Sequence, residues 1–135
     1  MRGLFIGILL GLTFTAVAQA KKQPREIRIR VEASAWEKSL LLEKLNDSGR
    51  FHGLHFDESE QDYDYRVVYG TAQDPALVQY GQANATMGSA SVFDAHGTEM
   101  FDFKREGRFT ESGVTNAVAK EIVKRLHTIL SQSPN

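Results

Sequence analysis

Apolar and charged side chains alternate along residues 26–32. The apolar members of the alternation are Ile27, Ile29 and Val31. A period of two predicts a strand that buries one face and leaves the other in water. The same period returns over residues 63–71, where Tyr63, Tyr65, Val67 and Tyr69 share one face. A shorter strand is predicted between these two, over residues 51–56.

Two segments carry apolar residues at helical spacing instead. The first helix, about residues 35–47, follows Ser34, which stands three residues before Glu37 and so forms a capping box. The run Asn46-Asp47-Ser48-Gly49 predicts its end. The second helix, residues 113–130, is strongly amphipathic, and Thr110 or Ser112 can cap it.

A long hairpin is predicted over residues 80–108. Asp94-Ala95-His96-Gly97 supplies its turn, because Asp suits the first position of a type I turn and Gly can take the positive φ that follows. Side chains before the turn are small, which predicts a sheet face on which a helix lies close. The order is β-α-β-β-β-β-α. It predicts an α+β fold, a two-layer sandwich of four to five mostly antiparallel strands with two helices on one face.

Residues 1–20 have the three parts of a secretory signal. Arg2 precedes an apolar run, and Ala18-Gln19-Ala20 forms a small-x-small cleavage site. We expect cleavage there, followed by a single α+β domain over residues 21–135 in the periplasm or outside the cell. Retention of the segment as an anchor is the alternative, since Lys21 and Lys22 follow it directly. No later segment of the sequence is expected to span a bilayer.

The composition excludes several function classes. The chain has no cysteine, no G-x-S-x-G motif and no phosphate-binding glycine loop, so we expect no enzyme activity and no cofactor. Loss of Arg2 with the signal changes the net charge from −1 to −2, which gives no overall attraction to nucleic acid.

The nearest approach to a metal cluster is His52, His55, Asp57 and Glu58. On a regular strand His52 points away from His55 and Asp57, so at most two of these ligands converge, and we expect no metal site. The acidic run from Asp57 to Asp64 lacks the spacing of a calcium loop and is expected to be a solvated turn.

Four aromatic residues form the candidate surface for a ligand or partner. They are Tyr63, Tyr65, Tyr69 and Phe103. A row of aromatic side chains at a period of two is also typical of sheet core, and that interpretation is the more common one.

Three segments of the chain resemble small cell-envelope α+β modules of bacteria. They are DYRVVYG (64–70), SVFDAHGTEMFDF (91–103) and AVAKEIVKRL (117–126). The modules are the amino-terminal domain of the Tol-system translocation protein and the periplasmic lipoprotein activators of cell-wall synthases. The resemblance implies a non-catalytic module that docks other envelope proteins. The chain departs from the lipoprotein members because it has no cysteine to accept lipid.

These observations predict an exported, non-catalytic protein-interaction module of the cell envelope that offers a sheet edge or sheet face to a protein partner. The first alternative is a periplasmic protein that binds a small ligand in an aromatic-lined groove at Tyr63, Tyr65, Tyr69 and Phe103. The second is a hydrolase or metalloenzyme built on His55 and Asp57.

Overall fold

A computed structural model of the chain describes residues 23–73, 86–108 and 110–132. The elements follow one another as β1 (Arg25–Glu32), α2 (Ala35–Gly49), the 3-10 turn η1 (Arg50–His52), β2 (Leu54–Glu58), β3 (Tyr65–Gln73), β4 (Thr86–Asp94), β5 (Glu99–Arg108) and α4 (Glu111–Gln132). This is the predicted order β-α-β-β-β-β-α. The predicted signal over residues 1–20 and the first part of the predicted hairpin, residues 80–85, lie outside the described residues.

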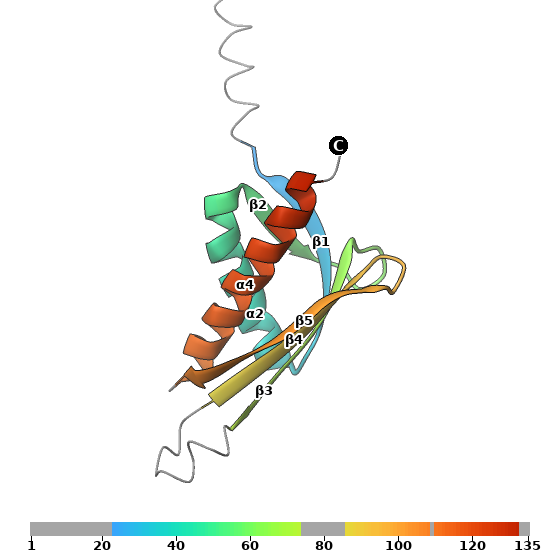
Figure 1. Cartoon of the computed structure of the whole chain (residues 1–135). Helices are drawn as coiled ribbons and strands as arrows, with labels where there is room; N and C mark the ends of the chain where they lie inside the picture. The colour runs from blue at the N-terminus through green and yellow to red at the C-terminus, as the bar shows by residue number, and fades with distance from the viewer. Residues whose placement is uncertain (1–22, 74–85, 109, 133–135) are drawn as a thin grey trace, which may run out of the picture.

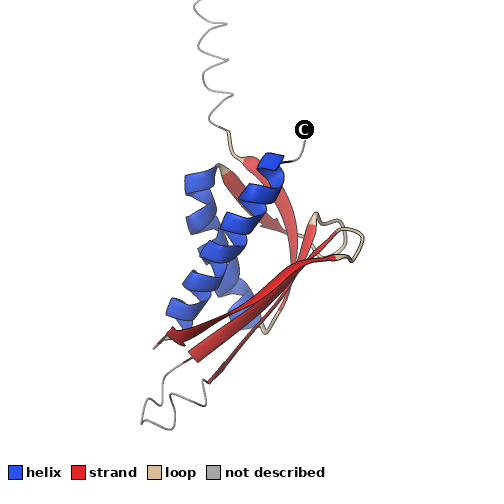
Figure 2. Cartoon of the chain, in the orientation of Figure 1, coloured by secondary structure: helices blue, strands red, loops and turns tan. Residues whose placement is uncertain are grey.

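Five strands form one sheet in the order β2-β1-β3-β4-β5, and both helices cover the same face of it (Figures 1 and 2). The predicted two-layer α+β fold is therefore confirmed. The strand directions are mixed rather than mostly antiparallel. The pairs β1·β2 and β1·β3 are parallel, whereas β3·β4 and β4·β5 are antiparallel. The parallel pair β1·β2 arises because α2 returns the chain to the start of the sheet, as in a β-α-β unit.

Strands β2 and β3 share β1 between them. Glu58, the last residue of β2, and Tyr65, the first of β3, are both partners of Ile29. The loop over residues 59–64 therefore crosses β1 near its middle. Two backbone hydrogen bonds hold the crossing, because Ser59 N donates to Ile29 O and Asp64 N donates to Arg28 O. The sheet thus has a helix-covered face and an open face that carries this loop.

The core lies between the sheet and the helices. Its members include the apolar positions of β1 (Ile27, Ile29, Val31), of α2 (Leu41, Leu45) and of α4 (Val118, Ile122, Leu126), all buried. Gly88 on β4 lets α4 lie close, as the small side chains predicted. A Cβ at this position would come within 3.2 Å of Val114 and of Val118. The capping box also forms, since Ser34 Oγ accepts from Glu37 N at 3.3 Å.

The end of the first helix was predicted wrongly. Helix α2 continues through Gly49, and the left-handed residue that ends the segment is Gly53, with φ of 67° after η1. Gly49 instead packs tightly against the next strand, where a Cβ would stand 2.7 Å from Leu54 O. The strand predicted to start at Phe51 starts at Leu54, and Phe51 is 88% exposed. The turn at Asp94 to Gly97 is confirmed, with Gly97 at φ of 85°.

Candidate functional sites at the two sheet edges

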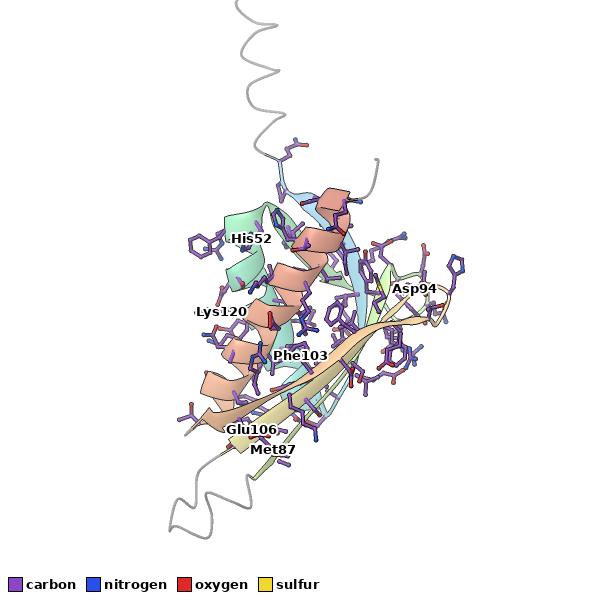
Figure 3. All side chains as sticks on the ribbon, in the orientation of Figure 1. His52, Met87, Asp94, Phe103, Glu106 and Lys120 are labelled. Atoms are coloured by element: carbon purple, nitrogen blue, oxygen red, sulfur yellow. The ribbon has the colours of Figure 1, made fainter. Side chains whose placement is uncertain are left out.

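The four aromatic residues predicted as a ligand or partner surface have different positions. Tyr63 lies in the loop before β3 and is half-exposed. Tyr65 lines a hollow of about 470 Å³ near the end of α4, together with Met100 and Leu130. Tyr69 is part of the buried core, at 4% exposure. Phe103, half-buried, lies on β5 on the side that faces α4 (Figure 3).

Tyr69 has a buried hydrogen-bond partner on α4. Its hydroxyl oxygen lies 2.7 Å from Thr115 Oγ1, and Thr115 is fully buried. Burial raises the pKa of Tyr69 to about 12, while the hydrogen bond with Thr115 opposes that shift. This side chain therefore joins the helix to the sheet and offers no surface to a ligand.

The first candidate site is the edge strand β5. Within the described chain, β5 pairs with β4 on one side and with no strand on the other. Phe101 and Phe103 point from β5 toward α4 and stack with ring centroids 6.2 Å apart. The Arg125 guanidinium of α4 lies over both rings, 5.3 Å from the centroid of Phe101 and 5.0 Å from that of Phe103. These contacts hold α4 beside the free edge of the strand.

A groove runs between α4 and the free edge of β5; we call it the α4–β5 groove. One half is a hollow of about 440 Å³, lined by Met100, Phe101 and Ile129 among others. The other half is a hollow of about 350 Å³, lined by Arg105 and Lys120 among others. Both hollows share Glu121 and Lys124, so the groove is continuous, with an apolar end and a basic end.

Charge in the α4–β5 groove is unbalanced. Glu121 is 14% exposed and is paired with Arg105, and it lies 3.8 Å from Arg125. Lys120 and Lys124 are exposed and make no ion pair within the described residues. Figure 3 labels Lys120 on the outer side of α4. The groove therefore carries more positive than negative charge, although the chain as a whole has a net charge of −1.

The open face of the sheet is crossed by ion pairs instead. The acidic run that was expected to be a solvated turn folds over β1, where Arg28 pairs with Asp62 at 2.5 Å and with Asp64 at 3.6 Å. On the helix-covered side, Lys38 of α2 pairs with Glu58, the last residue of β2, at 2.6 Å. Four members of the acidic run, Glu58, Glu60, Asp62 and Asp64, thus bind lysine or arginine side chains, and two of them neutralise the charge of Arg28 on β1.

The second candidate site is at the opposite edge, on β2. Of the four candidate ligands His52, His55, Asp57 and Glu58, only His55 and Asp57 stand together, as predicted, since Glu58 binds Lys38 and His52 lies with His127 of α4, ring centroids 4.8 Å apart. Glu26 of β1 joins His55 and Asp57 instead, with one ligand atom of each within 4.8 Å of the others. We call these three residues the β1–β2 triad.

Glu26 was missed because its role depends on strand register. Strands β1 and β2 pair in parallel with Glu26 opposite His55. Partners that lie 29 positions apart in the sequence cannot be matched from the alternation alone. Asp57 raises the pKa of Glu26 through a side-chain hydrogen bond, because the two carboxyl groups stand close together. The alternation of both strands is the only sequence signal, and it shows which face each residue takes.

Comparison with models of known protein families finds no match, and comparison with curated proteins finds none. Among solved structures, a PelC dodecamer from Paraburkholderia phytofirmans is similar with a TM-score of 0.45 at 11% identity, covering 78% of this chain and 88% of that one. Uncharacterized lipoprotein B from Nitrosomonas europaea is similar with a TM-score of 0.44 at 10% identity, covering 82% and 88%. The resemblance to Tol-system and synthase-activator modules stays a prediction. None of the helices in the described ranges has the length and apolar character needed to cross a membrane.

Proposed function

We propose that the chain is an exported, non-catalytic interaction module that binds an extended segment of another envelope protein along β5. The free edge of β5 beside the α4–β5 groove carries the proposal. Export is supported by the signal-like residues 1–20 of the sequence.

Addition of a strand would use both parts of the site, the free edge of β5 and the α4–β5 groove. An edge strand offers unpaired backbone donors and acceptors, so an extended segment can extend the sheet through main-chain hydrogen bonds. Every second side chain of the added strand would then point toward α4, into the groove. Main-chain pairing supplies affinity, and the groove supplies the selection between segments.

The residues that line the α4–β5 groove favour a particular pattern of side chains in the bound segment. Met100, Phe101 and Ile129 favour apolar side chains at one end, and Lys120 with Lys124 favours carboxylates at the other. The favoured segment therefore alternates along its length, with apolar residues at the groove side of one half and acidic residues at the groove side of the other.

The test is selection of linear peptides from a displayed random library against the purified chain. We expect the enriched sequences to carry, at every second position, apolar residues in one half and acidic residues in the other half. Reversing two rim charges, Lys120→Glu with Lys124→Glu, removes two attractions of up to about 1 kcal/mol each and introduces repulsion, so binding should weaken roughly ten-fold or more. Lys104→Glu is the control, because Lys104 is exposed on β5 and points to the open face, away from the groove.

A second measurement separates strand addition from simple charge attraction. Methylating single backbone nitrogens of a selected peptide removes one donor at a time, and only alternate positions should lose binding, because an edge pairs with alternate residues. Equal losses at every position would show that the segment does not lie along β5, and an equal effect of Lys104→Glu and of the double reversal would show that the charges of the α4–β5 groove do not select it.

A further inference from the structure

The β1–β2 triad has the ligand types and the placement of a metal site. His55 and Asp57 are two residues apart on β2 and therefore point to the same face, and Glu26 stands opposite His55 on the neighbouring strand. His55 Nε2 lies 3.2 Å from Asp57 Oδ1, and all three ligand atoms lie within 4.8 Å of one another. Tetrahedral zinc, with bonds of 2.0–2.2 Å, holds its ligand atoms roughly 3.4 Å apart. Small rotations of exposed side chains are enough to reach that spacing.

The neighbouring cation does not occupy this position. Arg28 follows Glu26 on the same face of β1 and stands opposite Asp57. Its guanidinium binds Asp62 and Asp64 on the crossing loop, away from the triad. Two carboxyl groups therefore face each other with an imidazole beside them, and no arginine of the described residues is paired with either, an arrangement in which a divalent cation relieves the repulsion.

We propose that Glu26, His55 and Asp57 bind one divalent transition-metal ion, with Zn²⁺ favoured. An imidazole nitrogen with two carboxylate oxygens suits zinc and its neighbours rather than Mg²⁺ or Ca²⁺, which prefer six or more oxygen ligands. Two carboxylates also balance the charge of the ion. Three protein ligands leave one position of a tetrahedral ion for water or for a group from a partner. The site is independent of the proposed function, since it lies at the β2 edge and the groove lies at the β5 edge.

The test is calorimetric titration of the untagged, chelator-treated chain with Zn²⁺. We expect one equivalent to bind, and we expect Glu26→Gln and His55→Ala each to weaken binding by roughly 10–100-fold. Zinc should also raise the melting temperature of the unaltered chain by mass action, and this rise should be smaller in both variants. Circular dichroism of the variants without metal checks that they fold, as expected for exposed side chains.

A second histidine pair provides the matched control. His52 and His127 lie with ring centroids 4.8 Å apart and can attract zinc on their own. The variant His52→Ala with His127→Ala should keep zinc affinity unchanged. Visible absorption of the Co²⁺-substituted chain should report four-coordination in this control and lose it in His55→Ala. Zinc affinity that follows His52 and His127, or that survives both Glu26→Gln and His55→Ala, would overturn the proposal.

Discussion

The buried pair Tyr69 and Thr115 predicts unequal effects of removing its two hydroxyl groups. Thr115 Oγ1 donates to the carbonyl oxygen of Glu111, one helical turn back, at 2.8 Å. Its proton is thereby committed, so the Tyr69 hydroxyl donates to Thr115 Oγ1 across 2.7 Å. The three groups form a short chain of hydrogen bonds from β3 into α4, in a region where Thr115 is fully buried and Tyr69 is 4% exposed.

The direction of the hydrogen bond between Tyr69 and Thr115 determines how much each variant loses in the free energy of unfolding. Tyr69→Phe removes one hydrogen bond and leaves the Thr115 donor satisfied, so we expect a loss of about 1 kcal/mol in the free energy of unfolding. Thr115→Val keeps the shape of the side chain but leaves the Tyr69 hydroxyl buried without a partner, which costs about 1–3 kcal/mol. In the double variant both polar groups are gone, so its loss should be smaller than the sum of the two single losses.

Urea denaturation followed by far-ultraviolet circular dichroism measures all three variants. Fluorescence is the poorer probe, because the one tryptophan, Trp36, is 65% exposed. Tyr63→Phe is the control: it removes a hydroxyl from the half-exposed loop residue and should change stability by no more than about 0.5 kcal/mol. A Thr115→Val loss smaller than that of Tyr69→Phe would refute the assigned direction of the hydrogen bond, and strictly additive losses would refute the coupling between the two hydroxyl groups.

Three further changes test the packing and the electrostatics. Gly49→Ala should destabilise the fold by about 1–3 kcal/mol in urea denaturation, because its Cβ would meet the backbone oxygen of Leu54 at 2.7 Å. Alkaline pH should also destabilise the fold, because the pKa of Tyr69 is raised to about 12 in the folded chain. The stabilisation from this shift is complete below a pH of about 10 and is lost as the pH rises through about 12. Unfolding measured as a function of pH should show a loss of up to about 2–3 kcal/mol in the free energy of unfolding. Glu37→Gln should cost about 1–2 kcal/mol, since Glu37 Oε2 accepts from both Thr71 N and Thr71 Oγ1 at 2.9 Å.

Each of these changes has a control in the chain. Gly70→Ala adds a Cβ with no atom within 4 Å and should leave stability nearly unchanged. Tyr69→Phe should show a smaller alkaline loss than the unaltered chain, and an identical loss would assign the effect to other groups. Glu43→Gln changes an exposed carboxylate of the same helix as Glu37. If Glu43→Gln were as costly as Glu37→Gln, the contact with Thr71 would not be the cause.

Local signals were enough to predict the architecture. Alternation, the capping box of Ser34 and Glu37, and the turn at Asp94 to Gly97 each specify structure within a few neighbouring residues, and each is present. The end of α2 was misjudged because Asn46 has a tertiary role. Its side chain donates to Phe56 O at 3.1 Å and accepts from Phe56 N at 2.8 Å, so an apparent stop signal is a contact between helix and strand.

The candidate sites were harder to predict because both depend on neighbours in space. The β1–β2 triad requires the parallel register that places Glu26 beside His55. The α4–β5 groove requires the knowledge that β5 is an edge, which follows from the order of strands and not from any property of residues 99–108. Phe103 was selected from the sequence, and the structure places it beneath Arg125, which itself lines the groove.

The two edges of the sheet differ in how they meet other chains. Strand β2 is five residues long, and a short edge offers little to pair with. Strand β5 has ten residues and is open to pairing, including pairing with a second copy of itself. Such a pair would place two α4–β5 grooves side by side, each with more positive than negative charge, and like charges oppose that contact. An acidic segment is instead attracted by the positive charge of the groove at the same edge. The excess positive charge of the groove therefore disfavours self-association of β5 and favours a partner of the chemistry proposed above.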